Sequence, residues 1–125
     1  MMTDWLLNKM RDCVASSTAT VGSTPTHMSF GSGDAAATGG DTELETETVR
    51  KVLERIDSTP DKAIVYYCTL DTTEGNDTHR EFGIHDGASG GDMHLRETFP
   101  VPYTKTSAVE TRMIVSVTFE SVTED

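Results

Sequence analysis

Apolar and polar side chains alternate through the second half of the chain, a pattern that predicts β-strands. Residues 63–70 are β-branched and aromatic and are fairly apolar on both faces, which predicts a central strand. Residues 80–86 and 93–99 flank a Gly-rich turn at 87–91, which predicts an antiparallel hairpin. Apolar and polar residues alternate over residues 109–119, which predicts one long strand with a core face and a polar face.

An apolar stripe at helical spacing predicts a short helix over residues 3–14. The stripe comprises Trp5, Leu6, Met10 and Cys13. A helix of this length is marginal in water by itself, so it must dock on another surface. We predict that it docks on a partner subunit or a second protein, with Trp5 as the buried anchor and with Leu6 and Met10 beside it. The Ser/Thr/Gly stretch that follows, up to Thr26, is typical of a linker.

Two further segments lie between this linker and the regular strands. Met28 and Phe30 alternate before the Gly31-Ser32-Gly33 break, which predicts a short strand that runs into a tight turn. From Glu43 to Ile56 the apolar positions fit both the period of a helix and the alternation of a strand. Local propensity alone favours a helix there.

Together these elements predict a mainly β protein, an antiparallel β-sandwich or barrel-like domain with a short N-terminal helix. The 125 residues provide for one modest core. We assign residues 1–16 to the N-terminal helix and linker, and residues 17–125 to the β-sandwich domain.

The charge of the chain limits its partners. Ten Lys and Arg stand against 21 Asp and Glu, a net charge of −11. Such a surface repels nucleic-acid phosphates and anionic membranes, so neither is an expected partner. An acidic surface with few Lys is also what proteins of halophilic hosts show. The sequence has no signal peptide and no membrane span, so we expect the chain to be made in a cytoplasm.

The side chains with chemical potential do not form a known catalytic or metal-binding pattern. His79, His85 and Asp86 could be combined into a metal site, but their spacing is not diagnostic, and solvated histidines at 27, 79, 85 and 94 are the expectation. Residues 31–33 lack the Lys of a phosphate-binding loop. The acidic run at 41–47 lacks the ligand spacing of a calcium loop. Cys13 and Cys68 are expected to be free thiols. We therefore predict no catalytic residue, no metal ligand and no cofactor.

Several motifs in a fixed order nevertheless form a recognisable pattern over about residues 28 to 120. They are Phe30-Gly31-Ser32-Gly33, Asp41-Thr42-Glu43-Leu44 followed by Glu47 and Arg50, Glu81-Phe82-Gly83-Ile84-His85-Asp86, Gly90-Gly91-Asp92-Met93-His94-Leu95-Arg96, Thr98-Phe99-Pro100 and Lys105-Thr106 before the last strand. This order resembles phage tail proteins of the tail-collar fibre type. The N-terminal helix and the strong acidity depart from that pattern.

The resemblance implies extended structure over residues 47–56 and structural roles for seven residues. These are Gly31, Gly33, Glu81, Gly83, Asp86, Arg96 and Lys105. In physical terms, Glu81 can pair with Lys105 or Arg96 across neighbouring strands. Gly83 within a strand marks a bulge or a close backbone approach.

The expected role is that of a virion protein of a tailed virus of a bacterial or halophilic archaeal host. A homo-oligomeric tail, baseplate or fibre-attachment component comes first, and a capsid-surface decoration or turret protein is the alternative. A module that binds a cation or glycan at the host surface is a further alternative. The symmetry of the oligomer is left open.

Overall fold

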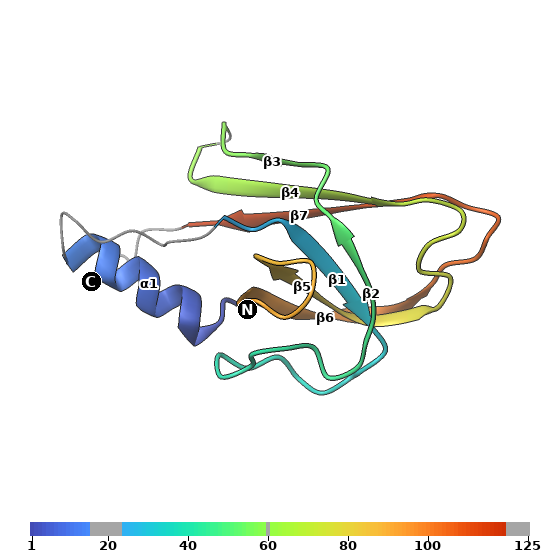
Figure 1. Cartoon of the computed structure of the whole chain (residues 1–125), viewed down its shortest axis with the longest axis horizontal. Coiled ribbons are helices and arrows are strands. Elements are labelled where there is room, and N and C mark those ends of the chain that lie inside the picture. The colour runs from blue at the N-terminus through green and yellow to red at the C-terminus, as the bar shows by residue number, and fades with distance from the viewer. Residues whose placement is uncertain (16–23, 60, 120–125) are drawn as a thin grey trace.

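The computed structural model describes residues 1–15, 24–59 and 61–119 (Figure 1). One helix, α1 (Asp4–Ala15), precedes the strands of these ranges. The strands are β1 (His27–Gly31), β2 (Glu47–Val52), β3 (Arg55–Asp57), β4 (Ala63–Leu70), β5 (Thr78–His85), β6 (Met93–Thr104) and β7 (Thr111–Thr118). The predicted linker and the boundary between residues 16 and 17 lie largely outside the described residues.

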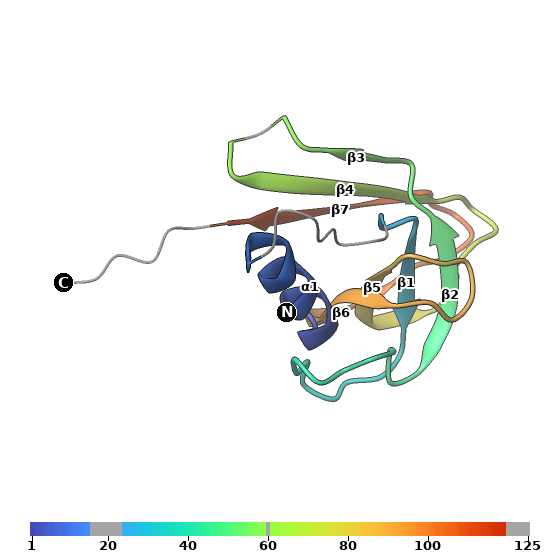
Figure 2. The ribbon, with the colours of Figure 1, turned by 60° about the vertical axis from the view of Figure 1, so that its left-hand side comes forward.

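The strands form two antiparallel sheets that pack as a sandwich, which confirms the predicted fold. Neither sheet closes on itself, so the barrel alternative was wrong. One sheet has the order β2-β1-β5-β6 and the other β3-β4-β7. The chain passes from the first sheet to the second between β2 and β3, and again between β6 and β7 (Figures 1 and 2). These crossings join the sheets at both sides of the sandwich.

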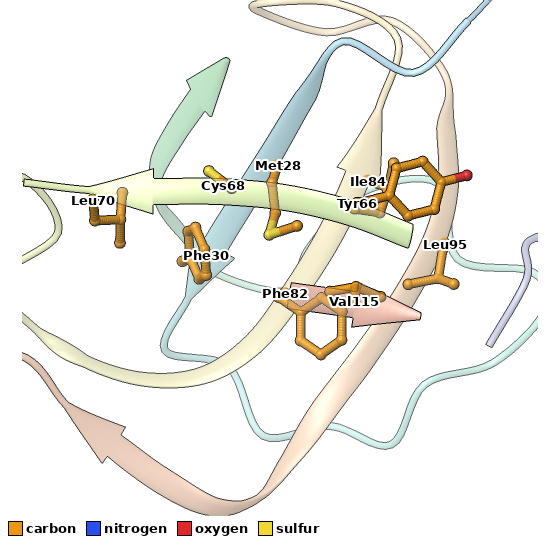
Figure 3. Packing of buried hydrophobic residues seen from close by; sticks show 9 residues of the cluster. All are labelled: Met28, Phe30, Tyr66, Cys68, Leu70, Phe82, Ile84, Leu95 and Val115. Carbon is orange, nitrogen blue, oxygen red and sulfur yellow. The ribbon is translucent and has the colours of Figure 1, made fainter. Parts of the chain in front are cut away.

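The core lies between the two sheets and is built from the alternation that the sequence shows. Met28 and Phe30 of β1 face Cys68 and Leu70 of β4 across the interior (Figure 3). Phe82, Ile84 and Leu95 complete it from the hairpin, and Tyr66 and Val115 from β4 and β7. β4 is the central strand of its sheet, as its two apolar faces predict.

The ambiguous segment after Glu43 is extended, as the resemblance implied and contrary to its helical propensity. Its strands, β2 and β3, are separated at Leu53 and Glu54, where the chain changes sheets. β6 is longer than expected because it continues through Pro100 and Pro102 after an irregularity in its pairing with β5. β7 begins at Thr111, so Val109 lies in the preceding turn and is exposed.

The helix forms at the expected place, and residues before it bind the sandwich directly. Thr3 precedes α1 and caps it, since its Oγ1 accepts a hydrogen bond from the Leu6 N–H at 3.4 Å. The Thr3 N–H donates to the His94 carbonyl at 3.0 Å, and the Arg96 N–H donates to the Met1 carbonyl at 3.0 Å. Residues 1–3 thus extend the four-stranded sheet alongside the first half of β6. No helix in the described ranges has the length and apolarity needed to cross a membrane.

Candidate functional site

Several of the residues that carry the resemblance lie at the loop of residues 32–46, which covers the outer face of the four-stranded sheet. Glu81 of β5 is 0% exposed. Its carboxylate accepts hydrogen bonds from the backbone N–H groups of Glu45 at 2.7 Å and Thr46 at 3.3 Å. A buried carboxylate needs such donors to replace water, so Glu81 fixes the end of the loop onto the sheet.

Arg96 of β6 fixes the beginning of the same loop. Its side chain is 2% exposed, and it donates to the Asp41 carboxylate at 2.9 Å and to the Ala35 carbonyl at 2.8 Å. Its Nε lies 3.6 Å from Glu81 Oε1, an ionic contact too long for a hydrogen bond. The backbone N–H of Thr38, with the Thr38 hydroxyl and Arg96, lowers the pKa of Asp41 against the opposing effect of burial. Of the two partners considered for Glu81, Arg96 is therefore the one that it contacts.

Three glycines allow the loop to lie this close to the sheet. A Cβ at Gly31 would lie 2.3 Å from the Thr46 carbonyl oxygen, and one at Gly33 would lie 2.0 Å from the Glu81 carboxylate. At Gly83 a Cβ would lie 3.1 Å from Leu44, whose buried side chain packs over that point of the sheet. The glycine in mid-strand thus marks a close approach.

Lys105 performs a similar task at the other end of the sandwich. The residue is 1% exposed, and its ammonium donates to the Asp71 carbonyl at 2.6 Å and to Asn76 Oδ1 at 2.8 Å. Both acceptors belong to the connection between β4 and β5, far along the chain from Lys105. The lysine therefore holds this connection and does not contact Glu81.

Asp86 closes the turn between β5 and β6. Its Oδ1 accepts a hydrogen bond from the Asp92 N–H at 2.8 Å, and its Oδ2 lies 3.7 Å from His94 Nε2. Gly90 and Gly91 have φ angles of 64° and 70°, which favour glycine.

The prediction of solvated histidines is wrong for three of the four. His79, His85 and His94 are only 1–2% exposed. His85 Nε2 lies 2.5 Å from the Ser29 hydroxyl, and His79 Nε2 lies 2.7 Å from the Gly75 carbonyl. Burial lowers the pKa of His85 to about 4, and it also lowers the pKa of His94. For His94 the error arose because a polar position on a strand was taken to face water, whereas Trp5 of α1 covers it. His79 was expected in a turn, but it lies in β5 and its ring is 5.4 Å from that of the core residue Phe30.

The Ser29–His85 contact does not have the geometry of a nucleophilic triad. Glu47 Oε1 lies 4.0 Å from the same Nε2 that contacts the Ser29 hydroxyl. A triad places its acid at the opposite ring nitrogen from the nucleophile. Ser29 is also fully buried, and burial raises the pKa of the Cys68 thiol to about 11. Among the described residues no cluster of His, Cys, Asp and Glu has the arrangement of a metal site.

The three residues predicted to bind a partner lie against the chain's own sandwich. The Trp5 ring is 4.8 Å from the His94 ring. Leu6 and Met10 border an apolar cavity of about 250 Å³ between α1 and the two sheets. None of the three is fully exposed.

The sequence did not predict the exposed isoleucine that lies beside a tyrosine and two arginines on the outer face of the three-stranded sheet. Ile114 of β7 is 55% exposed and lies opposite Tyr67 of β4, which in turn lies opposite Arg55 of β3. The guanidinium groups of Arg55 and Arg112 lie 4.2 Å and 4.8 Å from the Tyr67 ring centre. The available signal was Ile114 itself, an apolar residue among the polar positions of an alternating strand.

A scan against protein-family models and a search of curated proteins found no match for this chain.

Proposed function

We propose that this chain is a structural component of a tailed-virus particle, in a tail, baseplate or fibre-attachment position. It assembles with copies of itself and with other virion proteins, so its place of action is the virion. The resemblance to the tail-collar fibre type is the origin of this proposal.

The observation that carries the proposal is that the charged residues of this resemblance hold loops in place. Glu81, Arg96 and Lys105 are buried, and each binds the backbone of a long connection. Buried charges that bind loop backbone in this way determine the shape of the surface, whereas a catalytic group must be able to contact a substrate. This distribution supports a scaffold, and the Ser29–His85 geometry supports a role without catalysis.

The exposed surface provides the second support. Ile114, Tyr67 and Arg55 form a patch of the composition that protein–protein contacts favour, with Tyr and Arg among its members. A virion component must present such surfaces to its neighbours.

The proposal is tested by quantifying the chain in purified particles. Particles are separated on a density gradient, washed in the salt of the growth medium, and analysed by quantitative mass spectrometry against the major capsid protein. The expected result is a fixed copy number that survives the wash. Recovery of the chain only from host lysate, with none in particles, would overturn the proposal.

A further inference from the structure

Of the four sheet edges formed by the described strands, three carry features that discourage pairing with another strand. Residues 1–3 cover the first half of β6, and Pro100 and Pro102 interrupt the second half. β3 has only three residues, and β2 carries two adjacent positively charged residues, Arg50 and Lys51. Charges, prolines and short length are the usual means by which proteins protect an edge.

The edge formed by β7 carries fewer of these features, since Arg112 is its one charged residue. Its eight residues contain neither proline nor lysine, and their pairing with β4 has no irregularity. Beyond the β4 ladder, no backbone hydrogen bond joins residues 112–118 to another described residue. An eight-residue strand with an open edge is a template for another strand.

The direction of the backbone groups identifies which ones are open. The Phe119 N–H donates to the Lys62 carbonyl at 2.7 Å, so the odd-numbered residues of β7 direct their N–H and C=O groups towards β4. The N–H and C=O groups of Arg112, Ile114, Ser116 and Thr118 therefore point to the free edge.

The charges along β7 suit a second copy of this chain. Arg112 is the one charged residue between 111 and 118, and its guanidinium is 2.9 Å from the Glu54 carboxylate. The whole chain, in contrast, has an excess of acidic groups and a net charge of −11. Two copies therefore meet with the least repulsion where this strand, whose single charge is paired with Glu54, faces the same strand of the other copy.

We propose that β7 pairs edge to edge with β7 of a second copy, antiparallel about a two-fold axis. With Val115 at the axis, Ile114 lies opposite Ser116 of the second copy, and Arg112 lies opposite Thr118 of the second copy. These are the residues whose backbone groups are open, so every open N–H and C=O group of the strand gains a partner. On the inner face Met113 lies opposite Val117, so that apolar side chains meet. This inference rests on the proposed function, and it identifies β7 as the surface through which the copies assemble. A two-fold contact of this kind is compatible with a dimer or a dihedral assembly.

The expected affinity follows from the size of the contact. Eight residues at about 3.4 Å each span roughly 27 Å, and a sheet about 10 Å thick then buries on the order of 300 Å² per copy. Stable complexes bury about 800 Å² per partner. The dimer is therefore weak in dilute solution and is favoured where a particle concentrates the copies.

The test is sedimentation velocity of the full chain from about 10 μM to 1 mM in 1 M NaCl. Ser116→Pro removes an N–H that points to the free edge and leaves the β4 ladder intact, because proline is tolerated where the N–H faces solvent. Ser116→Ala is the matched control, since it changes the side chain and keeps the N–H. Ile114→Lys is a second variant at an exposed position, and it places two like charges at the contact. Circular dichroism checks that each variant is folded.

Wild type and Ser116→Ala should dimerise with rising concentration, whereas Ser116→Pro and Ile114→Lys should dimerise at least tenfold more weakly. The inference is overturned if wild type stays monomeric throughout, or if folded Ser116→Pro or Ile114→Lys dimerises like wild type. Such a result would leave the virion role intact, because the content of purified particles is measured independently of this contact.

Discussion

Replacing Glu81 by Gln removes the buried charge that holds the loop of residues 32–46 and leaves the shape of the side chain nearly unchanged. The carboxylate accepts one short hydrogen bond from the Glu45 N–H, at 2.7 Å, and a longer one from Thr46, at 3.3 Å. It also faces the Arg96 guanidinium at 3.6 Å. The substitution therefore weakens two backbone contacts and one ionic contact at once.

The magnitude follows from these contacts. A hydrogen bond to a charged group contributes about 1.5–3 kcal/mol, and loss of one member of a buried ion pair costs about 3–5 kcal/mol. Arg96 retains Asp41 at 2.9 Å, and the Gln side chain retains one acceptor oxygen. We therefore expect a loss near the lower end, about 3 kcal/mol of the free energy of unfolding.

The assay is equilibrium unfolding in urea, followed by circular dichroism. Glu110→Gln is the matched control, because Glu110 is exposed and its replacement should change stability by less than about 0.5 kcal/mol. Hydrogen exchange gives the local readout, since the amides of Glu45 and Thr46 should lose protection in Glu81→Gln. A cost equal to that of the control, or full protection of both amides, would refute the role assigned to Glu81.

Three further predictions concern the core, pH and salt. Ile84→Ala, at a fully buried site, should cost about 2–5 kcal/mol of unfolding free energy in the same urea assay. Ile114→Ala, at an exposed site, should change it by less than about 0.5 kcal/mol, and equal costs would contradict the burial of Ile84 and the exposure of Ile114. Because the pKa of His85 is lowered from 6.5 to about 4, its neutral form stabilises the fold above pH 6.5, and this contribution is lost as pH falls towards 4, by up to about 1.4 kcal/mol per pH unit. The melting temperature of wild type should therefore fall more steeply over this range than that of His85→Gln, and identical slopes would count against the burial of this group. Since the net charge is −11, raising NaCl from 0.1 to 3 M should increase both the melting temperature and the oligomer mass, and a flat response in both would remove the inference of a halophilic host.

The strands were predictable where local alternation matched the final burial. β4 and β7 show this best, since Tyr66, Cys68 and Leu70 on one strand and Val115 on the other face the core as their spacing predicts. The segment from Glu47 to Val52 was not predictable from its own residues, because its side chains suit both periods and its pairing with β1 decides the outcome.

The burial of the polar residues could not be read from local pattern. His94 and Arg96 occupy the polar positions of β6, and only the distant residues 1–5 and 32–46 remove them from water. Similarly, Ile114 is visible in the sequence, but the open edge beside it depends on the order of strands in the sheet. Contacts between segments far apart in the chain decide both features, and a single sequence does not specify them.

Electron microscopy of particles labelled with a gold-conjugated antibody against this chain tests the proposed role most directly. Label is expected at the tail, the baseplate or the attachment point of the fibres, at the same position on most particles. Label confined to capsid vertices or the capsid surface would contradict the assigned position and favour a decoration or turret role. Intact particles without label, in a preparation where antibody against a known tail protein does bind, would contradict the virion role itself.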